Sequence, residues 1–136
     1  MTVDTKRAIT VIGAMVITFL VLRVYLHTFP NQDLDVAGYN VHHLFTGLLL
    51  ITLGGLPMAI LRGNHRILDL AAVAFGVGLA MGLDEWVYLI VTDGSNASYI
   101  LPVSFWGGLG FVGFACGYAG GMSLYLHRRT KGRRDR

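Results

Sequence analysis

The chain has 136 residues, of which 54% are hydrophobic and only 14% carry a charge, and it contains 18 glycines. This balance excludes an ordinary soluble domain and is typical of an integral membrane protein. The net charge of +3 does not indicate nucleic-acid binding, because most basic residues flank apolar runs and leave no soluble face for a binding groove. The single cysteine, Cys116, excludes an intrachain disulfide.

The first apolar run follows Lys6 and Arg7 and predicts a membrane-spanning helix. This run is too long for a signal peptide, Arg23 interrupts it, and no small-residue cleavage site follows, so we expect it to be retained. Pro30 is expected to end the helix, and a polar connector that includes Asp33 and contains no basic residue comes next.

Three further apolar runs predict three more spans, joined by short connections. The turn around Arg62 and His65 is brief, so the second and third spans are expected to be antiparallel neighbours. A loop that contains Asp93 and Gly94 separates the third span from the fourth. The predicted spans are residues 8–26, 43–61, 67–92 and 99–126, followed by a basic tail over residues 127–136.

The distribution of basic residues predicts the orientation. Lys6, Arg7, Arg62, Arg66 and the basic tail all fall on one side of a four-span arrangement, and only Arg23 does not. The positive-inside rule places that side in the cytoplasm. We therefore expect an all-α membrane protein: a single transmembrane domain over residues 1–136, built as a four-transmembrane-helix antiparallel bundle with cytoplasmic N and C termini.

This orientation places the loops around Asp33 and Asp93 outside the cell. It fits a multi-pass protein of a prokaryotic inner (plasma) membrane, with the lipid bilayer as its surroundings. Aromatic residues at the outer boundary are then expected to form an interfacial belt. These residues are Trp86, Tyr88, Tyr99 and Trp106.

Two adjacent acids, Asp84 and Glu85, lie within the apolar third span. A charged side chain inside a membrane helix costs about 2.5–3.5 kcal/mol on insertion scales, so such acids are expected to meet a partner, a proton or a metal. His42 and His43 begin the second span on the same side of the membrane. Adjacent residues on a helix point about 100° apart, so we expect one member of each pair to approach the other pair.

A mixed set of imidazole and carboxylate ligands suits Zn, Mn or Fe, and open coordination positions would permit hydrolytic or carrier chemistry. We therefore expect His42, His43, Asp84 and Glu85 to be the metal ligands. Neighbouring polar groups would support them or balance their charge. These groups are Arg23, His27, Thr46 and Tyr88. Because no His-x-x-x-His or His-Glu-x-x-His motif is present, the sequence assigns no catalytic residue.

The alternative is a packing or assembly subunit of a larger membrane complex. In this interpretation Arg23 neutralises Asp84 or Glu85, and the two histidines cap the second helix. Glycines at intervals of four residues favour close helix packing within the bundle or between protomers, and predict a homo-oligomer or a larger membrane complex. The glycines expected to serve helix packing are Gly78, Gly82, Gly113, Gly117 and Gly121.

Two other chemistries have less support from the residues. A haem could be held by His27 together with His42 or His43. The only support for this site is that these histidines are expected on the same side of the membrane. Ser98 and Ser104 have no local motif that would make either a nucleophile.

The segments HHLFTGLLL and GVGLAMGLDEWVYLI resemble those of small prokaryotic integral membrane proteins that carry a His-His pair at the start of one span and an Asp-Glu pair in the next. The resemblance covers residues 39–92. It implies that His42, His43, Asp84 and Glu85 belong to one site, and it implies no particular reaction.

Overall fold

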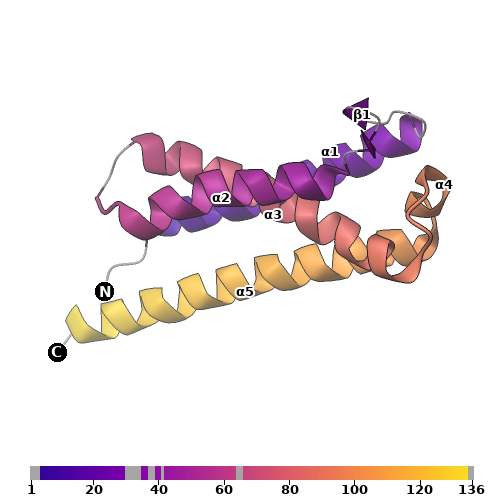
Figure 1. The fold of residues 1–136 in the computed structure, drawn as a ribbon. Coiled ribbons are helices and arrows are strands. Elements are labelled where there is room, and N and C mark those ends of the chain that lie inside the picture. Colours follow the sequence, from indigo (N-terminus) through magenta and orange to yellow (C-terminus); the bar gives the residue numbers. More distant parts are fainter. Residues whose placement is uncertain (1–3, 30–34, 37–38, 41, 64–65, 135–136) are drawn as a thin grey trace.

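The computed structural model describes residues 4–29, 35–36, 39–40, 42–63 and 66–134. The predictions that rest on Pro30, Asp33 and His65 lie outside these residues. Four helices are long and apolar enough to span a membrane, which confirms the prediction of a helical multi-pass protein. The elements are α1 Thr5–Thr28, β1 Asp35–Val36, β2 Tyr39–Asn40, α2 His43–Ile60, α3 Arg66–Val91, α4 Asn96–Tyr99 and α5 Pro102–Arg134 (Figure 1).

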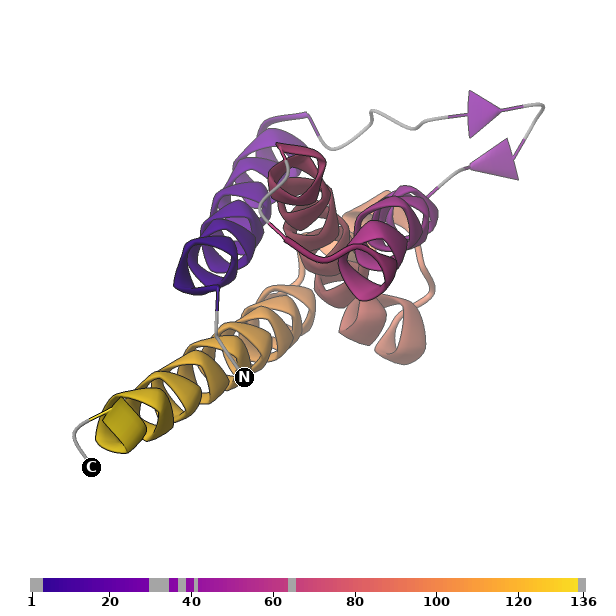
Figure 2. The same cartoon turned by 90° about the vertical axis from the view of Figure 1, so that its left-hand side faces the viewer.

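Helix α3 is the centre of the fold. It packs against α1, α2 and α5, whereas α1 and α2 do not pack on each other within the described residues. Small and apolar side chains of α3, among them Leu68, Ala72 and Ala80, are almost completely buried. This arrangement differs from a bundle in which every helix packs on two neighbours, because in the described part of the chain α3 is the one long helix against which α2 packs (Figures 1 and 2).

Glycines bring the backbones of α2 and α3 together. A Cβ atom added to Gly78 would lie 2.5 Å from the carbonyl oxygen of Gly47, and one added to Gly54 would overlap the carbonyl oxygen of Ala71. Only residues without a side chain permit this approach. Gly78 therefore lies in a packed seam, while a Cβ on Gly82 would meet only Leu44, at an ordinary contact distance of 3.6 Å.

Helix α5 begins later and extends further than the predicted fourth span. Residues 96–99 form the separate short helix α4, because the Ser95 side chain caps it and Pro102 begins a new helix without needing a backbone donor. Residues 127–134 of the basic tail continue α5, since lysine and arginine are good helix formers. The 33 residues of α5 extend about 50 Å, which exceeds the thickness of the hydrocarbon core.

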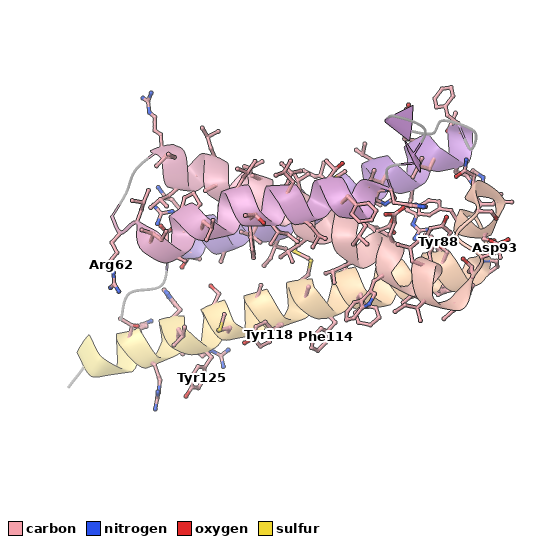
Figure 3. All side chains as sticks on the ribbon, viewed as in Figure 1. Arg62, Tyr88, Asp93, Phe114, Tyr118 and Tyr125 are labelled. Carbon is pink, nitrogen blue, oxygen red and sulfur yellow. The ribbon has the colours of Figure 1, made fainter. Side chains whose placement is uncertain are left out.

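The first half of α5 joins the core, and its second half separates from the other helices (Figures 1 and 2). Val112 is buried against Met15 and Phe19 of α1. Phe114, Tyr118 and Tyr125 are exposed and project away from the other helices (Figure 3). A Cβ atom on any glycine of the predicted packing stripe would meet nothing within 4 Å, so the stripe packs against no part of the described chain. These glycines are Gly113, Gly117 and Gly121.

Candidate functional site

The two acids of α3 lie side by side in the interior. Asp84 is fully buried and Glu85 is 2% exposed. Both lie in the last turns of α3, at the end of the molecule that carries Tyr88 and Asp93, far from the turn at Arg62 (Figure 3). The described chain thus buries two carboxylates close to one end of its apolar helices, where each requires donors.

Asp84 forms an ion pair with Arg23 of α1. Its Oδ1 atom lies 2.5 Å from Nη2 and accepts a hydrogen bond from Nε at 2.7 Å. Its Oδ2 atom accepts a hydrogen bond from the hydroxyl of Tyr99 in α4. Both oxygens of this buried carboxylate therefore have a hydrogen-bond donor.

The same guanidinium connects α1 to the start of α5. Nη1 donates to Ser104 Oγ and to the Tyr99 carbonyl, both at 3.2 Å, and Nη2 donates to the Ser104 carbonyl at 2.9 Å. The Tyr99 ring lies against the guanidinium, with its centroid 4.3 Å from Cζ. One side chain of α1 therefore holds α3, α4 and α5 in a fixed arrangement, which a planar group with five donors can do.

Glu85 faces the start of α2 instead. Its Oε2 atom accepts a hydrogen bond of 2.6 Å from the backbone N–H of Leu44. The first N–H groups of a helix have no partner within the helix, and the N-cap residue His42 makes no side-chain cap bond. Glu85 of α3 therefore caps α2, a role that was predicted for the histidines.

Both histidines contact Glu85. The Nδ1 atoms of His42 and His43 each lie 3.2 Å from Glu85 Oε1. His43 also reaches toward the other acid, with Nε2 3.4 Å from Asp84 Oδ2, and its ring packs edge-on against Tyr99. His43 Nε2 is buried and makes no hydrogen bond within the described residues. The structure therefore brings together the two pairs that the sequence placed on one side of the membrane.

Of the remaining predicted residues, Tyr88 contacts the site, whereas among the described residues His27 and Thr46 do not bond to its acids. Tyr88 joins the site through its ring, whose centroid lies 6.2 Å from that of His42, while its hydroxyl donates to the carbonyls of Gly94 and Ser95. His27 is on the last turn of α1, and Thr46 is partly buried. Neither His27 nor Thr46 bonds to the acids within the described part of the chain.

Sequence reasoning missed three members of the site: Tyr99, Ser104 and Gly108. A Cβ atom on Gly108 would lie 2.5 Å from Asp84 Oδ1 and 2.8 Å from Arg23 Nη2, so α5 can approach the ion pair only with glycine at this position. Tyr99 was expected in an interfacial belt, and Ser104 was considered only as a nucleophile. Tyr99 and Ser104 lie at the start of the predicted fourth span, on the same side of the membrane as Arg23. This position was the feature of the sequence that could have identified them as members of the site.

The hydroxyl of Tyr99 is the donor to Asp84 Oδ2. Burial raises the pKa of Tyr99 well above its usual range, and the negative charge of Asp84 raises it further. A protonated phenol can donate to Asp84 at any physiological pH. We name the set of Arg23, His42, His43, Asp84, Glu85, Tyr99 and Ser104 the polar cluster.

The formal charges of the polar cluster do not cancel when the histidines are neutral, because two carboxylates face one guanidinium. Within the described residues, no group of three or more His, Cys, Asp and Glu side chains is arranged to hold a metal ion. The chain matches no protein-family model, no curated protein and no solved structure.

Proposed function

We propose that this protein is an assembly subunit of a larger membrane complex and that the polar cluster fixes the arrangement of its own helices. The observation that carries the proposal is that each carboxylate oxygen of the acid pair has a partner within the chain. Asp84 is bound by Arg23 and Tyr99, and Glu85 by Leu44 and the histidines. Acids that are satisfied in this way hold helices together without an added ligand.

The surface for assembly in this proposal is the face of α5 that carries Gly113, Gly117 and Gly121. Glycine in a helix interior is about 1 kcal/mol less favourable than alanine, so three glycines on one face need a compensating contact. The glycines at 47, 54 and 78 have that contact inside the chain, whereas Gly113, Gly117 and Gly121 have open space around them. A neighbouring helix, from a second copy or from another membrane protein, would supply it.

Crosslinking in native membranes tests this proposal. Gly117→Leu should abolish the crosslinked species, because the added side chain holds the neighbouring helix away. Gly13→Leu is the matched control, since Gly13 of α1 also lies in a long helix with nothing within 4 Å but outside the stripe. Unchanged crosslinking of the Gly117 variant, or equal loss in both variants, would contradict the assembly surface.

A second function, the binding of a divalent metal such as Zn, Mn or Fe, has one specific observation in its favour. With neutral histidines the polar cluster carries one uncompensated negative charge. His43 Nε2 is buried beside Asp84 and makes no hydrogen bond to any residue that the structure describes. A divalent cation between the histidines and the acids would offset this negative charge and would give His43 Nε2 a partner. His42, His43, Asp84 and Glu85 would hold the metal, which would supply hydrolytic or carrier chemistry through an open coordination position.

Elemental analysis of the purified protein separates the two proposals. Metal binding predicts about one equivalent of Zn, Mn or Fe per chain, lost in His42→Ala/His43→Ala and in Asp84→Asn/Glu85→Gln alike. Combining all four changes should then add little, because the residues act as one unit. Metal content far below one equivalent after growth with added metal would leave only the assembly subunit.

A further inference from the structure

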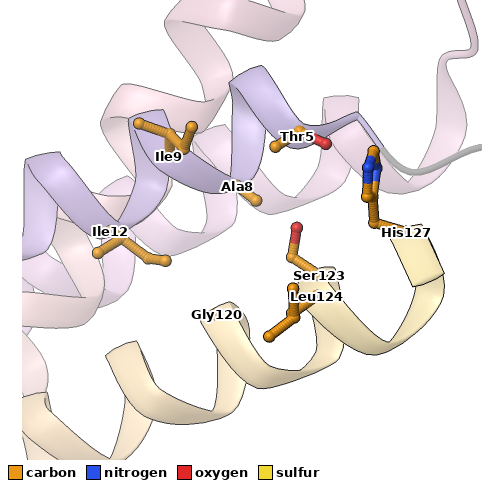
Figure 4. A pocket seen from close by; sticks show the side chains of 8 residues that line it. All are labelled: Thr5, Ala8, Ile9, Ile12, Gly120, Ser123, Leu124 and His127. Atoms are coloured by element: carbon orange, nitrogen blue, oxygen red, sulfur yellow. The ribbon is translucent and has the colours of Figure 1, made fainter.

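A groove between α1 and α5 lies at the end of the molecule opposite the polar cluster. It has a volume of about 290 Å³ and is lined mainly by apolar side chains. Ile12 and Gly120 mark one end, and Thr5, Ser123 and His127 lie toward the other (Figure 4). From Thr5 to Ile12 the groove follows α1 for about 10 Å. It forms because the second half of α5 separates from the core.

The groove is open to the surroundings along its length. Ile9 is 65% exposed and Leu124 is 51% exposed, although both line the groove. Their side chains are apolar, and the polar side chains of the lining are Thr5, Ser123 and His127. An occupant therefore has an apolar part between the helices and a polar part at the level of Thr5 and His127.

Two lysines, Lys6 and Lys131, lie close in the sequence to the polar residues of the groove. Lys6 follows Thr5 directly, and Lys131 lies one turn beyond His127 on the same side of α5. Two acids near this end among the described residues, Asp4 and Asp69, are both paired with Arg7, at 3.1 Å and 3.5 Å. Within the described residues neither lysine has an acidic partner.

We infer that this groove binds an anionic phospholipid, with an acyl chain between α1 and α5 and the phosphate near Lys6, His127 and Lys131. Apolar walls and a basic rim match a molecule that has both a hydrocarbon chain and a negative headgroup. A transmembrane helix of a partner protein would match the walls but would leave the basic rim without a counter-charge. The glycine stripe runs along α5 beside the groove, so lipid binding and assembly are tested with separate variants.

Native mass spectrometry of the detergent-solubilised full chain, titrated with phosphatidylglycerol or phosphatidylcholine of equal chain length, tests the inference. The wild type should retain phosphatidylglycerol at least about fivefold more strongly, because each basic residue near a membrane surface contributes about that factor. Lys131→Gln should lower the affinity for phosphatidylglycerol about fivefold and leave that for phosphatidylcholine unchanged. Arg62→Gln, which removes an exposed charge between α2 and α3, is the control and should change neither.

A pair of leucine substitutions tests the groove itself. Gly120→Leu places a side chain toward Ile12 and should abolish retention of both lipids. Gly121→Leu makes the same change one residue further along, where a Cβ meets nothing within 4 Å, and should leave lipid binding intact. Equal retention of the two lipids by the wild type would overturn the inference. Wild-type binding by Gly120→Leu, or loss of crosslinked protomers instead of lipid in that variant, would also overturn it.

Discussion

Arg23 and Asp84 form an ion pair in which Nη2 and Oδ1 lie 2.5 Å apart and the aspartate side chain has no exposed surface. The pair joins two helices, and its members are separated by 61 positions in the sequence. Each partner is buried with further hydrogen bonds, so removing one of them leaves the other charge without compensation in an apolar region. Loss of both partners should therefore destabilise the protein by less than the two separate losses combined.

We predict that Arg23→Gln and Asp84→Asn each lower the free energy of unfolding by about 3–5 kcal/mol. The double variant should be destabilised by less than the sum of the single effects, because no unpaired charge remains. Reversible unfolding of the purified protein in mixed micelles gives the four free energies of this cycle. Arg62→Gln, at an exposed turn, should change stability by less than about 0.5 kcal/mol. Additive effects of Arg23 and Asp84 would contradict the buried pair.

The close approach of α5 to the ion pair predicts a large effect of a single methyl group at Gly108. Gly108→Ala places Cβ 2.5 Å from Asp84 Oδ1 and should destabilise the protein by about 1–3 kcal/mol. Gly110→Ala is the matched control on the same helix, because a Cβ there meets nothing within 4 Å. It should stabilise α5 slightly, by up to about 1 kcal/mol. Thermal unfolding of both variants measures the contrast, and equal melting temperatures would count against the close approach of α5 to Asp84.

The loop between α3 and α4 predicts a local dependence on pH. Hydrogen bonds from Ser98, and then from Ser95, lower the pKa of Asp93 from 3.8 to about 2. Because the folded pKa is lowered, the contribution of Asp93 to stability is present above its unfolded pKa and is lost as the pH falls through the folded value. Ser98→Ala should return the pKa of Asp93 toward 3.8 in a ¹³C NMR titration of the carboxyl group. Thr130→Ala, near the far end of α5, should leave it unchanged, and an unaltered Asp93 titration in Ser98→Ala would contradict the assignment.

The distribution of basic residues predicts the orientation in the membrane. A reporter fused after Arg136 should be active in the cytoplasm, and one inserted at Gly94 should be active outside, because one span separates the two positions. Both fusions should be read in the same strain, with immunoblots to confirm equal expression. Activity of both reporters on one side of the membrane would mean that α5 does not cross the bilayer, which contradicts the proposed topology.

The sequence was sufficient for the helical architecture, since each apolar run is long enough to cross a bilayer and turn residues separate the runs. It was also sufficient to predict that Asp84 and Glu85 need partners, because burying a charge is unfavourable in any fold. The short connection between the second and third apolar runs placed His42 and His43 beside them. These conclusions depend only on residue chemistry and on distance along one helix or between sequential helices.

Which acid binds which partner was decided by the tertiary structure. Neighbouring positions on α3 point about 100° apart, so Asp84 faces α1 and α5 while Glu85 faces α2. The rotation of α3 about its own axis sets these directions, and the residue pattern does not predict it. Glycine spacing was equally ambiguous: Gly78 is packed against α2, whereas Gly113 and Gly117 have open space around them. A spacing of four residues defines a face of a helix, but only the position of the neighbouring helix determines whether that face is covered.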